Sequence, residues 1–294
     1  GSPQVIGLLG AAIILLALFV WRERRAAEPV LPLQLFTDRG FVVVSAALFM
    51  TTMSLFAAIV FLPVFLQLVT GASATESGLL MLPLLVASAL STVVCGWVMA
   101  KTGRYKAFPV AGLAAMAAGL LLFSTLGSTG SRLLASAFMV IFGVGFGMVT
   151  QILVVAIQNA VEPRQIGTAT AAANLFRALG GSVGVAVFGA IFTGGLRHWL
   201  PLTLHGRVPR GISAAGIQAT PGYIHRLPGA VEHAIAGAVG NSLHDVFLVA
   251  APVALTGCLI VMLLRERPLR GRAGAHPAPA SADGEAAASE KLAA

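Results

Sequence analysis

Long, nearly continuous runs of apolar residues dominate the chain and alternate with short polar segments. A hydrocarbon core about 30 Å thick needs roughly 20 apolar residues of helix, and seven runs are close to that length or longer. Backbone groups in lipid must be hydrogen-bonded internally, and the runs lack the two-residue alternation of barrel strands, so each predicts a membrane-spanning helix. The predicted spans are Val5–Trp21, Phe41–Val69, Ser77–Ala100, Phe108–Leu126, Leu133–Val161, Ile166–Leu196 and Val246–Leu264.

The polar segments predict how the spans are connected. Residues 22–40 predict a cytoplasmic linker, because Pro29 and Pro32 interrupt a stretch too polar to span. Residues 197–245 predict an external loop with a short interfacial helix at its end, and residues 269–294 predict a disordered cytoplasmic tail. The expected fold is therefore an all-α polytopic membrane protein. It has a single inserted helix at residues 1–21 and a six-helix bundle within residues 41–268.

The distribution of Lys and Arg predicts the orientation. Counted alternately from the first span, the loops and ends on one side hold 13 basic residues and those on the other side hold 5. The positive-inside rule assigns the first side to the cytoplasm, so the N-terminus is expected outside and the C-terminus inside. The 13 are Arg22, Arg24, Arg25, Arg39, Lys101, Arg104, Lys106, Arg164, Arg265, Arg267, Arg270, Arg272 and Lys291.

Composition excludes several other classes of protein. With 57% hydrophobic and 10% charged residues, the chain cannot be an ordinary water-soluble domain, where charged residues make up about 25%. The net charge of +8 does not indicate nucleic-acid binding, because the basic residues cluster where apolar runs end. The chain enters its first apolar run without a Met or a preceding basic residue, so we expect it to be the C-terminal part of a longer protein.

Arg177 is the strongest single candidate for a functional residue. It lies about 11 residues into the sixth span, roughly 16 Å from the start of that helix. A charge at such depth costs about 2.5 to 17 kcal/mol, so it must face an aqueous cavity or a partner. The partner could be a carbonyl, the amide of Asn174, a substrate anion or an acid elsewhere. A structural role and a role in the substrate pathway both stay open.

Polar residues and prolines in other spans are further candidates. Gln151 and Gln158 are seven residues apart and share one helix face, where they could line a cavity or join helices. Gln67 follows Pro63 by four residues and, like the other two glutamines, could line the substrate pathway or join helices. Pro63 and Pro83 each predict a break or bend in a helix. Phe61 belongs to a set of residues offering adaptable apolar surface, with Met50, Met53, Phe56 and Phe65.

The spacing of the glycines and histidines indicates structural rather than catalytic or metal-binding roles. Glycines four residues apart, at 143/147 and 180/184, predict close helix packing. The run Gly180–Gly184 matches G-x-S-x-G, but a nucleophile elbow requires a strand-to-helix turn rather than an apolar helix. The histidines lack the spacing of metal ligands, so no enzyme, metal or other cofactor is expected.

One loop carries a family resemblance. The segment Gly96-Trp97-Val98-Met99-Ala100-Lys101-Thr102-Gly103-Arg104-Tyr105-Lys106 resembles the G-x-x-x-D-R-x-G-R-K loop of the major facilitator superfamily. Gly96 and Gly103 would allow close helix contact and a turn, while Arg104 and Lys106 would latch onto helix ends or acids and bias a gate. Ala100 and Lys101 replace the acid and the first arginine of this signature.

Other segments are similar to the fourteen-span QacA/EmrB drug:proton antiporters. The segments Phe61–Gln67, Gln158–Val161, Asn174–Ser182 and Leu243–Leu248 carry this likeness, which covers residues 1–268. The resemblance implies a bacterial inner-membrane multidrug exporter, of which this chain would hold spans eight to fourteen. It also implies alternating access, a proton gradient as the energy source, and hydrophobic substrates that include cations. An exporter of a metabolite, lipid or peptide, or a truncated non-transporting protein, stays open.

Overall fold

The computed structural model describes residues 3–25, 36–103, 105–127, 131–204 and 229–264 of the chain. Throughout these ranges the regular structure is helical. The helices are α1 (Pro3–Arg25), α2 (Arg39–Leu68), α3 (Ala74–Leu80), α4 (Leu82–Thr102), α5 (Ala107–Ser124), α6 (Arg132–Ala160), the 3₁₀ turn η3 (Pro163–Gln165), α7 (Ile166–Thr203) and α10 (Gly229–Met262).

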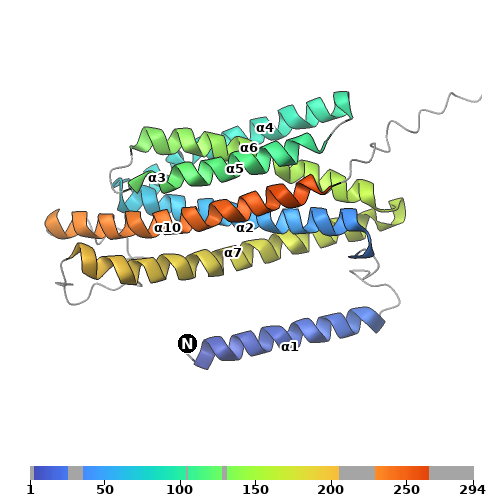
Figure 1. Ribbon diagram of the computed structural model, residues 1–294, viewed down its shortest axis with the longest axis horizontal. Helices are drawn as coiled ribbons and strands as arrows, with labels where there is room; N and C mark the ends of the chain where they lie inside the picture. Colours follow the sequence, from blue (N-terminus) through green and yellow to red (C-terminus); the bar gives the residue numbers. More distant parts are fainter. Residues whose placement is uncertain (1–2, 26–35, 104, 128–130, 205–228, 265–294) are drawn as a thin grey trace, which may run out of the picture.

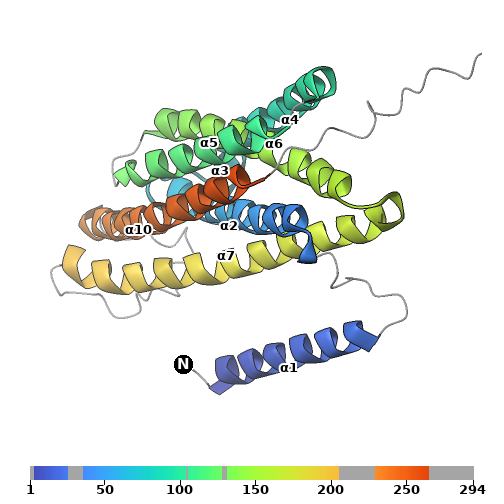
Figure 2. The same cartoon turned by 45° about the vertical axis from the view of Figure 1, so that its right-hand side comes forward.

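Six helical segments in the described ranges are long and apolar enough to cross a membrane. They correspond to α2, α3 with α4, α5, α6, η3 with α7, and α10. These are the last six of the seven predicted spans, and they confirm an all-helical bundle. The first predicted span also forms a helix, α1, which lies apart from the bundle (Figures 1 and 2).

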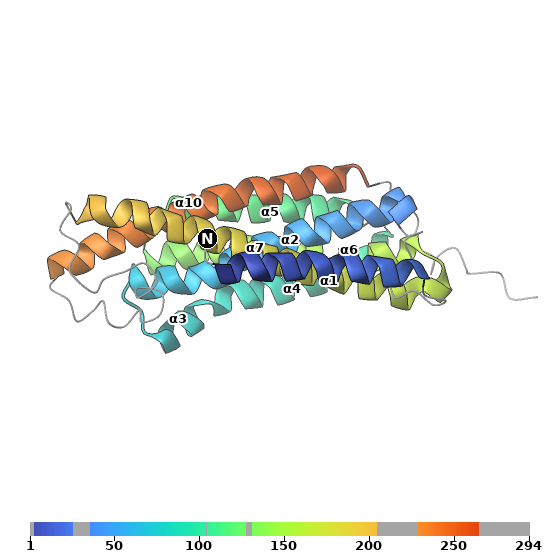
Figure 3. The ribbon, with the colours of Figure 1, turned by 90° about the horizontal axis from the view of Figure 1, so that it is seen from below.

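Two helices, α2 and α6, link the rest of the bundle. Helix α6 packs against α4 and α5, and α2 packs against α7 and α10. The two halves of the bundle join where α2 meets α6 and where α5 meets α10. Viewed from below, α5 and α10 lie along one side of the bundle and α4 lies toward the other (Figure 3). Most of the buried side chains are apolar, and they form the core between these neighbouring helices.

Glycines on α6 set the spacing of three helices. A Cβ built at Gly143 would overlap the carbonyl oxygen of Leu84 on α4, and one at Gly147 would overlap that of Ser88. Between them, Gly145 faces α5, where its Cβ would lie 2.5 Å from the carbonyl oxygen of Gly112. The predicted packing role of the 143/147 pair is confirmed, because only a residue without a side chain lets these backbones touch.

Hydroxyl groups stabilise the same contact between α4 and α6. Ser91 Oγ donates to the carbonyl oxygen of Val144 at 2.9 Å, and Thr92 Oγ1 donates to that of Gly147 at 3.1 Å. Such bonds form because glycine lets the neighbouring helix approach within hydrogen-bonding distance of the α6 backbone. In lipid, each is worth about 0.6 kcal/mol on average.

The two prolines predicted to break helices behave differently. The helix breaks just before Pro83, since α3 ends at Leu80 and α4 begins at Leu82 with the proline in its first turn. Helix α2, in contrast, continues through Pro63 without a break, which leaves the predicted alternative of a bend. A proline removes one backbone hydrogen bond, and α2 is held on several sides by α6, α7 and α10.

Two helices are longer than hydropathy predicts. Helix α7 continues from the predicted end at Leu196 to Thr203, passing through Pro201. Helix α10 begins at Gly229, so the predicted interfacial helix at 229–243 is the first part of α10 rather than a separate element. The predicted loop at 197–245 is therefore wrong at both ends. Hydropathy reports which residues suit lipid, whereas a helix continues wherever its backbone bonds are satisfied.

Candidate functional site

Arg177 lies on α7 one turn before the glycines that press this helix against α2. A Cβ at Gly180 would overlap the carbonyl oxygen of Phe49, and one at Gly184 would lie 3.0 Å from that of Met53. This contact confirms the predicted packing role of the second glycine pair. The Arg177 side chain is partly buried, and no hydrogen bond or ion pair joins it to another residue in the described part of the chain.

Two of the predicted polar candidates lie on exposed faces. Asn174, one turn before Arg177, is exposed, as are Ala178 and Ser182 at four-residue steps along α7. Gln151 is exposed on α6. The structure therefore leaves Arg177, Asn174 and Gln151 accessible to a partner or ligand outside the bundle.

The other two glutamines bond within the chain. Gln67 Nε2 donates to Ser77 Oγ at 3.1 Å and joins α2 to α3, while Gln158 Nε2 donates to Thr170 Oγ1 at 3.0 Å and joins α6 to α7. These contacts match the alternative in which glutamines connect helices, each bond being worth about 0.6–2 kcal/mol. Thr170 lies four residues before Asn174 on α7, so the Gln158 amide is bonded on the same helix face as Asn174.

Phe61 lines a pocket of about 370 Å³ between α2 and α7. Its ring centre lies 5.4 Å from that of Phe192 on α7, and most of its surface is buried. The rest of the predicted adaptable surface is largely internal packing. The Met53 and Phe65 side chains are buried, and the Phe56 ring rests against Gly181.

Basic residues gather at the end of the bundle where α2 begins and α10 ends, which we call the basic end. It includes Arg39, Lys101 and Lys106. The Lys106 ammonium donates to the carbonyl oxygen of Met262 at 2.7 Å, which confirms the expected latch onto a helix end. The Lys101 ammonium lies 3.4 Å from the centre of the Trp97 ring, a cation–π contact.

The glycines of this loop have separate roles. Gly103 ends α4 with φ of 71°, a left-handed conformation that glycine adopts without strain, so the predicted turn is confirmed. The described part of the chain provides no close contact at Gly96, because a Cβ built there meets no atom of it within 4 Å. Arg104, the remaining predicted residue of the motif, lies outside the described residues.

The opposite end holds bonds between helices that the sequence did not reveal. The Trp199 indole N–H donates to Asp245 Oδ2 at 3.1 Å and joins α7 to α10. His244 Nδ1 lies 2.7 Å from the carbonyl oxygen of Ser124 at the end of α5, and the Arg132 guanidinium donates to that of Thr70 at 2.8 Å. Both residues lie within the predicted loop at 197–245, so the sequence alone does not reveal their pairing across two helices.

The bundle described here defines a class, namely an all-helical, multi-pass membrane protein of the transporter type. Residues 3–185 match the Major Facilitator Superfamily, and the chain belongs to this family.

Three relatives illustrate the similarity. An uncharacterized MFS-type transporter of Mycobacterium tuberculosis (strain ATCC 25618 / H37Rv) is 38% identical over 269 residues, covering 92% of this chain and 39% of the relative. The multidrug transporter protein MdtP of Bacillus subtilis (strain 168) is 36% identical over 190 residues, covering 65% and 35%. A tetracycline resistance determinant of Streptomyces rimosus is 28% identical over 317 residues, covering 96% and 91%. The chain thus spans well under half the length of the first two relatives.

Proposed function

We propose that the chain is the C-terminal part of a multidrug exporter that works by alternating access and is driven by protons. Membership of the transporter family supports this proposal, as do two relatives whose names refer to multidrug transport and tetracycline resistance. The fourteen-span type is part of the proposal. Under that assignment, α1 is the eighth span and the α2–α10 bundle is the second six-helix half.

The observation that carries the proposal is Arg177. It is partly buried within a membrane-spanning helix, yet in the described ranges it has neither an acidic nor an amide partner. A cation in that position must be compensated by water, by a ligand or by an acid, since its burial in lipid alone is costly. The exposed Asn174 and Gln151 side chains extend the polar surface available to a hydrophobic substrate.

Alternating access requires two bodies that move against each other around a central cavity. The bundle would be one such body, because glycine contacts and hydroxyl bonds hold its helices together. The acids that couple transport to protons would come from the rest of the protein. At the basic end, the bond from Lys106 to Met262 would tie the loop after α4 to α10 when the inner gate moves.

The test uses the complete native gene product, expressed in a bacterial host lacking its own major drug exporters. Its intact mass is measured first, and cells are then loaded with ethidium, Hoechst 33342 or tetracycline. We expect efflux that stops when a protonophore dissipates the proton gradient. Arg177→Ala should abolish efflux at normal membrane levels, whereas Arg132→Ala, which removes a cation at the opposite end, should retain it.

Three outcomes would contradict parts of the proposal. Efflux that persists without a proton gradient would refute proton coupling. Export of none of the dyes or drugs, with transport of a metabolite, lipid or peptide in a wider panel, would replace the multidrug assignment. Wild-type efflux by Arg177→Ala would remove Arg177 from the substrate pathway.

A further inference from the structure

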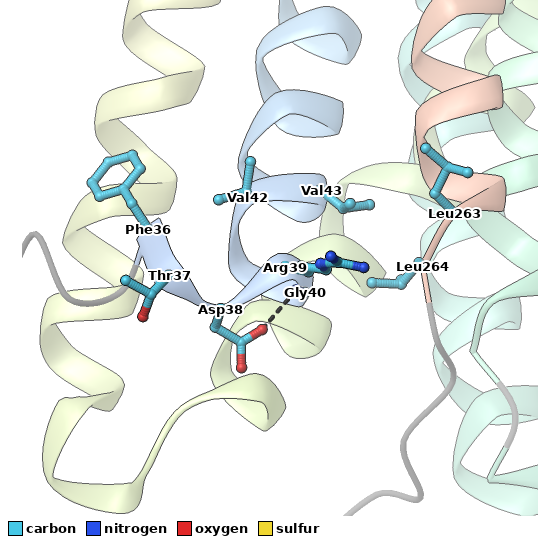
Figure 4. Close-up of a pocket in the computed structure, with 9 residues that line it drawn as sticks. All are labelled: Phe36, Thr37, Asp38, Arg39, Gly40, Val42, Val43, Leu263 and Leu264. Atoms are coloured by element: carbon cyan, nitrogen blue, oxygen red, sulfur yellow. Dashed lines mark hydrogen bonds between the residues drawn. The ribbon is translucent and has the colours of Figure 1, made fainter.

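A pocket of about 830 Å³ opens at the basic end, between the start of α2 and the end of α10 (Figure 4). Its walls come from two helices whose ends meet there, so it lies where a membrane-spanning bundle passes from lipid into water. The lining residues are Phe36, Thr37, Asp38, Arg39, Gly40, Val42, Val43, Leu263 and Leu264.

Arg39 is the cation of this pocket. It is the first residue of α2, its side chain is exposed, and Figure 4 shows it extending toward Leu263 and Leu264 across the pocket. No residue in the described ranges forms a hydrogen bond or ion pair with its guanidinium. A guanidinium can bind a phosphate group through two parallel hydrogen bonds, which makes Arg39 a fitting contact for a phosphate.

The neighbouring charges favour an anion despite the presence of one acid. Asp38 accepts hydrogen bonds from the backbone N–H groups of Gly40 at 2.6 Å and Phe41 at 3.3 Å, so its carboxylate caps its own helix. Lys106 adds a second cation at this end, because its ammonium is bonded to Met262, the residue before the two leucines of the wall.

The remaining walls are apolar. Val42 and Val43 belong to the first turn and a half of α2, and Leu263 and Leu264 follow the end of α10. The Leu263 side chain is 73% exposed and that of Met262, the last residue of α10, is 54% exposed, whereas Leu264 is buried. A free phosphate would use the cation and leave the exposed Val42 and Leu263 side chains in water. A molecule with a phosphate at one end and hydrocarbon at the other satisfies both parts.

We propose that this pocket binds an anionic phospholipid, whose headgroup phosphate contacts Arg39 while its acyl chains lie along Val42, Leu263 and the exposed face of α10. Lys106 contributes positive potential rather than direct contact. The Phe36 ring of the pocket lies 6.1 Å from the ring of Phe176, the residue before Arg177, so the pocket adjoins the part of α7 that carries Arg177. A bound lipid would bridge the start of α2 and the end of α10, two helix ends that are far apart in the sequence.

The test measures lipid binding to the purified chain in dodecyl maltoside by native mass spectrometry. Phosphatidylglycerol is titrated against phosphatidylcholine, which has similar acyl chains and a headgroup without net charge. We expect tighter binding of phosphatidylglycerol, and weaker binding at high salt. Arg39→Gln should weaken phosphatidylglycerol binding roughly fivefold, the usual effect of one basic residue near an anionic lipid surface.

Matched variants separate this site from general attraction to a basic protein. Arg39→Lys should retain most of the affinity, and Arg39→Gln should leave phosphatidylcholine binding unchanged. Arg132→Gln removes one cation at the opposite end and should have no effect. Equal binding of the two lipids by the wild type would overturn the proposal, as would equal losses in Arg39→Gln and Arg132→Gln. Circular dichroism confirms that each variant keeps its helices, so that a loss reports on binding.

Discussion

Replacing Gly147 with alanine should weaken the contact between α4 and α6. The added Cβ would overlap the carbonyl oxygen of Ser88 and lie 2.9 Å from the Cβ of Ser91, neither of which can rotate away. The helices must then separate, and overpacking of this kind costs about 1–3 kcal/mol. Separation also stretches the bonds that Ser91 and Thr92 make to α6, each worth about 0.6 kcal/mol.

An opposing effect reduces the loss. Alanine is favoured over glycine within a helix by up to about 1 kcal/mol, which leaves a net loss of roughly 1–3 kcal/mol in the free energy of unfolding. Gly96→Ala is the matched control, because it adds the same methyl group to α4 where no atom lies within 4 Å. That variant should be as stable as the wild type or more stable.

The chain provides its own reporters for this measurement. Cys95 and Cys258 are free and buried, so a thiol-reactive dye becomes fluorescent only when the bundle opens. Unfolding is followed in dodecyl maltoside with increasing sodium dodecyl sulfate. If Gly147→Ala proved no less stable than Gly96→Ala, the argument from close backbone contact would be refuted.

Three further predictions concern single side chains. In the complete gene product, Arg177→Ala should abolish efflux while membrane levels stay normal, and a fluorescent dye-efflux assay with quantitative immunoblotting measures both. Trp199→Phe should lower the free energy of unfolding by about 0.6 kcal/mol, because the indole bond to Asp245 is lost. The exposed Trp97 gives the control, since Trp97→Phe removes no bond of this kind between helices, and equal losses in both variants would argue against a role for that bond. Lys106→Met should loosen the last turn of α10, detected as faster amide hydrogen exchange there. Unchanged exchange would show that the ammonium does not stabilise this helix end.

The sequence predicted the membrane helices well because their signal is strong and local. Apolar runs predicted all six membrane-spanning segments found in the described ranges, and the four-residue spacing of Gly143 and Gly147 predicted a contact that the structure confirms. Helix ends were harder, since α7 and α10 continue well beyond their apolar runs. A hydropathy pattern indicates where lipid is tolerated, and it says little about where backbone hydrogen bonding stops.

The direction in which individual side chains point was the hardest feature to predict from the sequence. The sequence left open whether Gln67 and Gln158 line a cavity or join helices, and the structure shows that each bonds a hydroxyl on an adjacent element. A helix that is apolar on all sides gives no indication of which face meets lipid and which meets protein. The same limitation applies to Gly96, where the lack of a side chain suggested a close contact that the described part of the chain does not provide.

The pairing of α4 with α6 has a consequence for the synthesis of the chain. Helix α4 precedes α5 in sequence, but its main neighbour is α6, so α4 must enter the bilayer before its partner exists. Thr92 can remain hydrogen-bonded before α6 is inserted. Its hydroxyl lies 2.8 Å from the carbonyl oxygen of Ser88 on its own helix and 3.1 Å from that of Gly147 on α6. A nascent chain can therefore keep this polar group bonded in lipid until α6 arrives, and then share the same proton with the incoming helix.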